Sequence, residues 1–112
     1  MDKIQLARFH KIIEDNVSNP FFSNDNLAEL LNLSLRQTHR QVKAETGLPP
    51  LKYMRKYRLE RAMSLMRNGN CRSVKAAARS VGFINVGYFI RLFKKRYGKS
   101  PLQILREEGW RN

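Results

Sequence analysis

Cysteine and long apolar runs are what this chain most clearly lacks. A single cysteine, Cys71, cannot form an intrachain disulfide, and the two histidines, His10 and His39, form no metal-ligand cluster with it. No apolar run approaches the roughly 20 residues that cross a bilayer, and no signal-peptide pattern opens the sequence. We therefore expect a cytoplasmic protein with no membrane association, no metal and no other cofactor.

Acidic residues are scarce, and they are unevenly placed. The 112 residues include 22 Lys or Arg against nine Asp or Glu, which gives a formal net charge of +13. Residues 1–50 contain equal numbers of each sign, so the whole excess lies in residues 51–112. Such a surface attracts polyanions, because neutralising phosphates releases condensed counterions. Charge alone leaves DNA, RNA, an anionic membrane or simply a solvated basic surface open.

Catalytic groupings are missing too. The acidic residues are scattered, no glycine-rich loop could cradle a phosphate, and no nucleophile has an evident base beside it. Single-stranded RNA is usually bound on exposed aromatic side chains, whereas most aromatics here fall at buried helical positions. The basic residues do not form the clean cationic face of a membrane-surface helix. We therefore expect no enzyme, and double-stranded DNA is favoured as the partner.

Capping and helix-stopping residues divide the chain into short segments of helical periodicity. Ser23, Ser73 and Asn85 supply N-caps, and two Ser-x-x-Gln capping boxes begin at Ser34 and Ser100. No stretch shows a competing β-type alternation of comparable length. The sequence therefore predicts an all-α fold of about seven helices. Their approximate spans are residues 3–17, 24–31, 35–46, 51–67, 74–81, 86–97 and a short helix from 101.

An internal repeat organises these helices. Residues 27–33 match residues 77–83 at an offset of 50, and the segment after each following helix, Gly-Leu-Pro-Pro-Leu or Gly-Lys-Ser-Pro-Leu, matches at an offset of 51. Each copy reads as a short helix, a tight turn and a second helix ending at glycine, which is the helix-turn-helix pattern. The small Ala28 and Ala78 let paired helices pack closely, while Leu33 and Phe83 fill the turns.

The expected architecture follows from this repeat. Two three-helix helix-turn-helix subdomains, at residues 1–50 and 69–112, are joined by a long connecting helix at 51–68. Single helix-turn-helix patterns arise often by chance, but two in register rarely do. The pair therefore indicates DNA binding more specifically than the charge does.

Motifs along the second half resemble those of the AraC/XylS type of DNA-binding domain. The connecting helix carries Tyr-Arg-Leu-Glu-Arg-Ala at residues 57–62. The second unit carries Val81-Gly82-Phe83, Tyr88-Phe89, Arg91, Phe93-Lys94, Tyr97-Gly98 and Ser100-Pro101. The resemblance covers about residues 5–108 and is strongest from residue 51 onward.

The resemblance implies two recognition helices that enter successive major-groove segments of the DNA. Members of this family are usually bacterial transcription activators, sometimes repressors, and often contact RNA polymerase. Most carry a separate sensing or dimerisation region, so we expect this chain to be the DNA-binding part of a larger regulator, although stand-alone members exist. The operator, the effector signal and the choice between activation and repression stay open.

The first recognition helix, at 35–46, is predicted to bury Leu35, Thr38 and Val42 and to present a basic face. Base contacts are expected from Arg36, Gln37, His39 and Arg40, because arginine suits guanine and the N-terminal half of such a helix reaches base edges. Arg36, His39 and Arg40 also stand where the resemblance places base-reading residues. Phosphate contacts are expected from Ser34 and Lys43.

The second recognition helix, at 86–97, is predicted to bury Phe89, Leu92 and Phe93. Base contacts are expected from Val86, Gly87, Ile90 and Arg91, and phosphate contacts from Asn85, Lys94 and Lys95. Only Arg91 among the base-facing positions offers strong donors, while Lys94, Lys95, Arg96 and Lys99 should meet phosphates or face water. We therefore expect the first unit to supply most of the specificity for DNA bases. The second unit is expected to supply most of the affinity for the DNA phosphate backbone.

Two inner positions of the first recognition helix depart from the family's pattern. Thr38 and Gln41 stand where its members generally have larger apolar residues. Dense packing is what fixes a protein interior in one arrangement. We therefore expect the first subdomain to be less firmly packed and to order fully only on DNA.

Overall fold

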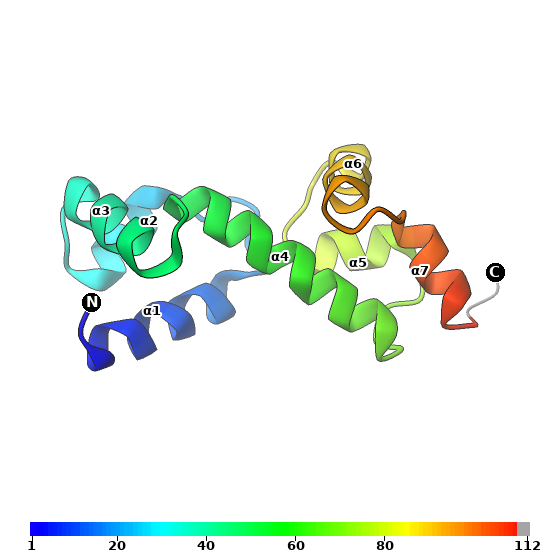
Figure 1. Ribbon diagram of the computed structural model, residues 1–112, viewed down its shortest axis with the longest axis horizontal. Helices are drawn as coiled ribbons and strands as arrows, with labels where there is room; N and C mark the ends of the chain where they lie inside the picture. Colours follow the sequence, from blue (N-terminus) through cyan, green and yellow to red (C-terminus); the bar gives the residue numbers. More distant parts are fainter. Residues whose placement is uncertain (110–112) are drawn as a thin grey trace. The chain divides into compact units, whose positions relative to one another are not determined.

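The computed structural model describes residues 1–109, and in this range it contains seven α-helices and no strand (Figure 1). The helices are α1 (Lys3–Asn16), α2 (Asn24–Leu31), α3 (Leu35–Thr46), α4 (Pro50–Arg67), α5 (Val74–Ser80), α6 (Val86–Tyr97) and α7 (Pro101–Glu107). The prediction of an all-α fold is confirmed. No helix within these residues combines the length and the apolar character needed to cross a bilayer.

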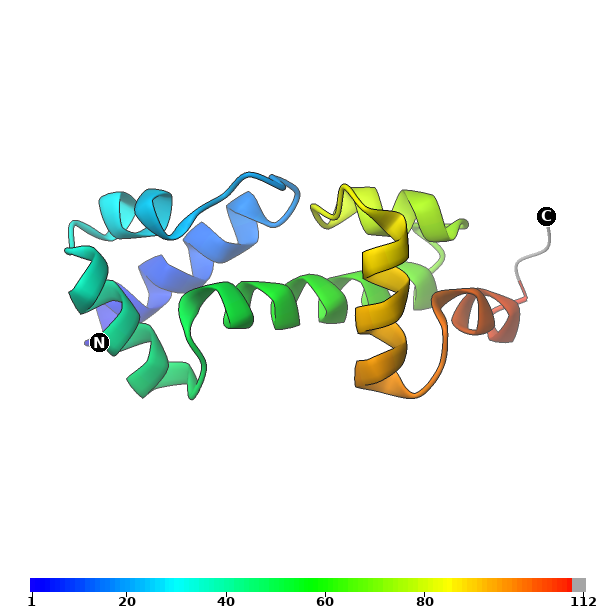
Figure 2. The ribbon, with the colours of Figure 1, turned by 90° about the horizontal axis from the view of Figure 1, so that it is seen from above.

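Two compact units make up the chain, one at Met1–Lys56 and the other from Tyr57 onward. The first unit contains α1, α2, α3 and the beginning of α4, and the second contains the rest of α4 with α5, α6 and α7. Within each unit, two helices joined by a tight turn run in clearly different directions, α2 and α3 in one and α5 and α6 in the other (Figure 2). Each unit therefore contains one helix-turn-helix.

Side chains at the predicted caps fix where the helices begin. Ser34 and Ser100 form the predicted capping boxes with the glutamines three residues later. Ser23 forms a third box with Asn26, which the sequence did not predict because Glu or Gln is the usual residue at this position. α4 begins at Pro50, one residue earlier than predicted, since the first helical position has no intrahelical partner for an N–H and so suits proline.

Apolar side chains from all its helices fill the first unit. The Phe9 ring of α1 lies 5.4 Å from the Tyr53 ring, between centroids, so α1 packs against the beginning of α4. α2 contacts both α1 and α3. The buried apolar residues of this unit include Phe9, Ile13, Phe22, Leu27, Ala28, Leu31, Val42 and Met54.

The core of the second unit is richer in aromatic rings. The Phe89 ring lies 5.2 Å from that of Phe83 and 5.6 Å from that of Phe93, and Phe93 lies 4.7 Å from Tyr97, all between centroids. Leu92, predicted to be buried, is only half-buried. The other buried apolar side chains include Leu59, Ala62, Met66, Ala77, Ala78, Val81, Ile104 and Leu105. Each unit thus has a core of its own.

The two helix-turn-helix turns share one hydrogen-bond pattern. The backbone N–H of Leu33 donates to the carbonyl of Ala28 at 3.0 Å, and the N–H of Phe83 donates to the carbonyl of Ala78 at 2.9 Å. The residue before each donor is left-handed, with a φ of 56° at Asn32 and 86° at the glycine of the second turn. Both alanines are buried, as the repeat predicts, and Phe83 is buried while Leu33 is half-buried.

Three large apolar residues in the helices of the first unit are exposed, among them Leu35, which was predicted to be buried. Ile4 is 82% exposed, Leu30 45% and Leu35 52%. Helical side chains lean toward the N-terminus of their helix, so residues in the first turn extend past its beginning. Ile4 and Leu35 lie in the first turns of α1 and α3, which explains their exposure, and the predicted burial of Leu35 is wrong.

Buried polar atoms without hydrogen-bond partners among residues 1–109 lie on the inner side of α3 and at the beginning of α2. Thr38 is 1% exposed, and its Oγ1 has no hydrogen-bond partner within residues 1–109; the same holds for the buried Oε1 of Gln41 and Oδ1 of Asn24. A buried unpaired polar group costs about 1–3 kcal/mol. A pocket of about 430 Å³ lies beside Thr38, lined also by Asn24, Asp25, Leu35, Arg36, His39 and Pro50.

Thr38→Val is therefore expected to stabilise the first unit by about 1 kcal/mol, because valine keeps the shape of threonine and removes the unpaired hydroxyl. Amide hydrogen exchange in α3 should slow by roughly fivefold. Thr46→Val is the matched control. The Thr46 hydroxyl donates to the Val42 carbonyl at 2.8 Å and accepts from the Leu48 N–H at 3.2 Å, so its loss should speed exchange. Equal destabilisation by both changes would contradict a buried hydroxyl without a partner at Thr38.

Candidate nucleic-acid interface

The first recognition helix, α3, is held at both ends by its own residues. The Ser34 Oγ accepts from the Gln37 backbone N–H at 3.1 Å, and the Gln37 Oε1 accepts from the Ser34 N–H at 3.0 Å. At the other end, Gly47 is left-handed, with a φ of 80°, and its N–H donates to the Lys43 carbonyl at 2.8 Å. Thr38 and Val42 anchor the inner face in the core. The orientation of the outer face is thereby fixed.

The outer face of α3 carries the predicted basic residues. Arg36, His39, Arg40 and Lys43 are all exposed. None of them takes part in an ion pair within residues 1–109, so their charges and donors are available to a ligand. An arginine fork of this kind matches the O6 and N7 acceptors of guanine.

The two capping residues have fewer free groups than the prediction assumes. The Gln37 Oε1 is used in the capping box, which leaves only its amide N–H groups to donate to a base. The Ser34 Oγ accepts one bond, but its hydroxyl proton can still donate to a phosphate. Leu35, predicted to be buried, instead lies exposed beside Arg36.

The second recognition helix, α6, begins at an asparagine cap. The Asn85 Oδ1 accepts from the Tyr88 N–H at 2.9 Å, and its amide N–H groups remain able to donate to a phosphate. A Cβ at Gly87 would lie 3.3 Å from this Oδ1, so glycine leaves room for the cap itself. Val86 is half-buried, whereas Ile90 and Arg91 are exposed. The Arg91 guanidinium lies 5.3 Å from the centroid of the Tyr88 ring.

The basic residues at the end of α6 fall into two groups. Lys94 and Lys95 are exposed and form no ion pair within the part of the chain that the structure describes. Arg96 instead lies 3.8 Å from the Glu60 carboxylate, and Lys99 donates to Glu107 at 2.8 Å, which lowers the pKa of that carboxyl. Arg96 and Lys99, which were expected to meet phosphates or face water, are exposed, and each also has a carboxylate partner.

Two exposed basic residues of α5 were missed by the sequence analysis. Lys75 and Arg79 lie one helical turn apart on this first helix of the second helix-turn-helix. The first helix of such a unit crosses the DNA backbone, so their spacing could have identified them as phosphate contacts. The described residues contain no group of three or more His, Cys, Asp or Glu that could hold a metal ion.

Comparison with known proteins identifies this arrangement. Residues 27–107 match the helix-turn-helix domain family. The HTH-type transcriptional activator RhaS of Escherichia fergusonii is 41% identical over 78 residues, which is 70% of this chain and 28% of that protein. The chain belongs to the AraC/XylS-type helix-turn-helix family. This AraC-type chain thus spans less than a third of the length of the curated relatives it matches.

Solved structures share the AraC-type fold. The C-terminal domain of the response regulator yesN from Fusobacterium nucleatum has a TM-score of 0.78 at 32% identity, over 87% of this chain and 93% of that one. The DNA-binding domain of the global transcriptional factor AdpA, solved with a target DNA, has a TM-score of 0.83 over 92% of this chain and 91% of that one. Its identity is 23%, so it shows the fold alone.

Proposed function

We propose that this chain binds double-stranded DNA sequence-specifically and regulates transcription as the DNA-binding part of a larger bacterial regulator. The observation that carries the proposal is the outer face of α3, where exposed basic side chains that form no ion pair with any described residue lie on one helix of a helix-turn-helix. RhaS is an activator of transcription, and the AdpA domain, which has the same fold, was solved with its target DNA. Both support a DNA-bound role.

The proposed contacts divide between bases and phosphates. α3 and α6 enter successive major-groove segments, with residues 1–50 and 69–112 acting as the two reading subdomains and 51–68 as the connecting helix. Arg36, His39 and Arg40 read bases from α3, with Gln37 as a neighbour, and Val86, Gly87, Ile90 and Arg91 face bases from α6. Ser34, Lys43, Asn85, Lys94 and Lys95 bind phosphates.

The remaining partners follow from the family. A sensing or dimerisation region is proposed to belong to the whole protein, because this chain spans 28% of the RhaS length. RNA polymerase is the partner through which such a regulator would act. Chromosomal DNA places the protein in the bacterial cytoplasm, and no enzymatic step is part of the proposal.

Selection of bound duplexes from a random DNA pool at near-physiological salt tests this function. Two short conserved blocks about one helical turn apart are the expected result, because two recognition helices on one DNA face read sites at that spacing. A titration of the best site should give a salt slope corresponding to on the order of 6 to 10 phosphate contacts. Recovery of no motif, with equal affinity for all duplexes, would identify a nonspecific polyanion binder.

Lys94→Ala is expected to weaken binding to all duplexes alike and to reduce the magnitude of the salt slope by about one, because one phosphate contact is lost. Lys99→Ala provides the control, since Lys99 is already paired with Glu107 and should change the slope much less. Binding measured at several salt concentrations distinguishes the two. If the affinity lost on Lys94→Ala depended on the DNA sequence, Lys94 would be a base-reading residue instead of a phosphate contact.

A further inference from the structure

The outer faces of α2 and α5 carry opposite charges at equivalent positions. At the offset of 50 that relates the two units, Asp25 corresponds to Lys75 and Glu29 corresponds to Arg79. All four side chains are exposed. The basic pair suits a phosphate backbone, whereas the acidic pair would be repelled by one. The outer face of α2 is therefore poorly suited to a contact with the DNA backbone.

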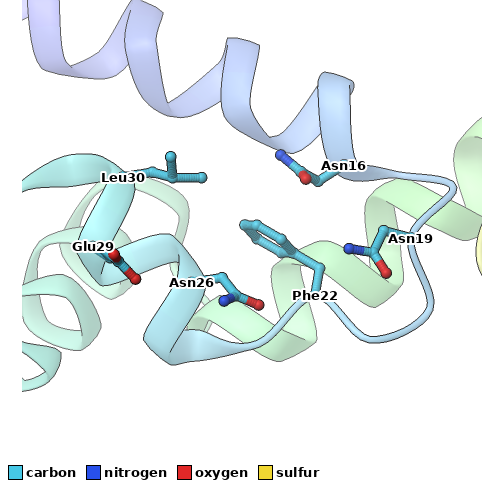
Figure 3. A pocket seen from close by; sticks show the side chains of 6 residues that line it. All are labelled: Asn16, Asn19, Phe22, Asn26, Glu29 and Leu30. Atoms are coloured by element: carbon cyan, nitrogen blue, oxygen red, sulfur yellow. The ribbon is translucent and has the colours of Figure 1, made fainter.

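A pocket of about 360 Å³ lies between the end of α1 and this face of α2 (Figure 3). Its lining residues are Asn16, Asn19, Phe22, Asn26, Glu29 and Leu30. Figure 3 shows the Phe22 ring between Leu30 and Asn16, with Asn26 and Glu29 along one edge. Leu30 and the neighbouring Phe21 are large apolar residues left exposed, Phe21 at 76%. The pocket thus combines an apolar floor with a polar edge.

Two of the four polar residues that line this pocket, Asn16 and Glu29, offer hydrogen-bond acceptors, whereas the Asn19 Oδ1 already accepts from the Phe21 N–H at 3.0 Å. The Asn16 amide nitrogen donates to the Ile12 carbonyl at 2.8 Å, which leaves its Oδ1 as an acceptor. The Glu29 carboxylate forms no ion pair or hydrogen bond within residues 1–109. The Asn26 Oδ1 is used by Ser23 in the capping box. An incoming cation therefore finds a carboxylate and an amide oxygen beside an aromatic ring.

We propose that this pocket and the adjoining Phe21 form a docking surface for a basic segment of another protein, one that presents an Arg or Lys next to an apolar side chain. An arginine stem would lie on Phe22 and Leu30 while its guanidinium pairs with Glu29, since arginine combines apolar packing with bidentate hydrogen bonding. The neighbouring apolar side chain would cover Phe21. The surface goes beyond the proposed function and does not depend on DNA binding.

Selection of a displayed library of random dodecapeptides on the whole chain tests the proposal. The expected result is enrichment of peptides with Arg or Lys beside Leu, Ile or Phe. A synthetic copy of the best peptide should lose about tenfold or more in affinity on Glu29→Arg, which introduces the charge that α5 has at the equivalent position. Phe21→Ser should weaken the same peptide by roughly fivefold, because it removes exposed apolar contact area. Fluorescence anisotropy gives these affinities.

Glu14→Arg is the matched control, because Glu14 is an exposed carboxylate of the same unit, on α1, that does not line this pocket. It should change the peptide affinity by less than about twofold. Glu29 is exposed, so thermal melting should show that both variants stay folded. Failure to enrich basic peptides, or equal losses on Glu14→Arg and Glu29→Arg, would overturn the proposal. Self-association that disappears on Glu29→Arg would also overturn it, because the occupant would then be a second copy.

Discussion

Phe93→Ala should unfold the second unit. Phe93 is fully buried, with Phe89 and Tyr97 packed against its ring. Truncation of such a residue costs about 3–5 kcal/mol. A unit of this size has a total free energy of unfolding of only about 3–8 kcal/mol, at roughly 0.05–0.15 kcal/mol per residue. Amide resonances of α5, α6 and α7 should therefore lose their dispersion in ¹H–¹⁵N spectra, and DNA affinity should fall to what the first unit supplies.

Phe93→Leu is the control for this result. Leucine keeps most of the buried apolar volume, so the cost should stay well below that of alanine. The spectra of the second unit should then remain dispersed, with a lower midpoint in urea. Equal behaviour of the two variants would mean that the aromatic row from Phe83 to Tyr97 contributes little to the core.

Arg40→Ala should abolish discrimination between the best DNA site and its variants at one base pair. A bidentate contact between arginine and guanine contributes about 1–3 kcal/mol of discrimination, or roughly 5- to 150-fold in relative affinity. The exposed Arg40 guanidinium is not engaged in an ion pair within residues 1–109, so nothing in this part of the chain competes for its donors. Affinities for the best site and for single-base variants measure the change.

Lys43→Ala provides the comparison, since Lys43 lies on the same face of α3 nearly one turn further along the helix. It should weaken the best site and its variants by the same factor, because a phosphate contact carries no sequence information. If Arg40→Ala lowered the affinity for all sites by the same factor, Arg40 too would be a contact to the DNA phosphate backbone. The base specificity would then have to come from Arg36 or His39.

Local signals predicted nearly all of the fold. Helix beginnings at Ser34, Asn85 and Ser100 were readable because each side chain caps its own helix through residues three positions away. The repeat at an offset of 50 predicted both turns, since Ala28 and Ala78 each accept the bond that closes the turn. Such features depend on a few neighbouring residues, so the sequence contains them directly.

Contacts between helices could not be predicted from the sequence in the same way. Arg96 and Glu60 are far apart in the sequence, and their pairing depends on how α6 packs on α4. Helical periodicity predicted that Leu35 is buried, because periodicity takes no account of where a helix begins. Leu35 lies in the first turn of α3 and is exposed. The pocket at Glu29 likewise depends on the position of the loop between α1 and α2. The basic positions of α3, in contrast, are all exposed, as their spacing predicted.

The matching ends of α3 and α6 have a consequence for engineering. Both helices contain 12 residues, both begin after an oxygen-bearing side chain, and both end at a left-handed glycine whose N–H donates at 2.8 Å to the lysine carbonyl four residues earlier. The residues that cap each helix and pack against the core lie at the helix ends and on the inner faces. The outward-facing residues can therefore be substituted without disturbing either helix. A chimera with the α3 outer residues grafted onto α6 should prefer two direct copies of one half-site, which would make the reading helices exchangeable cassettes.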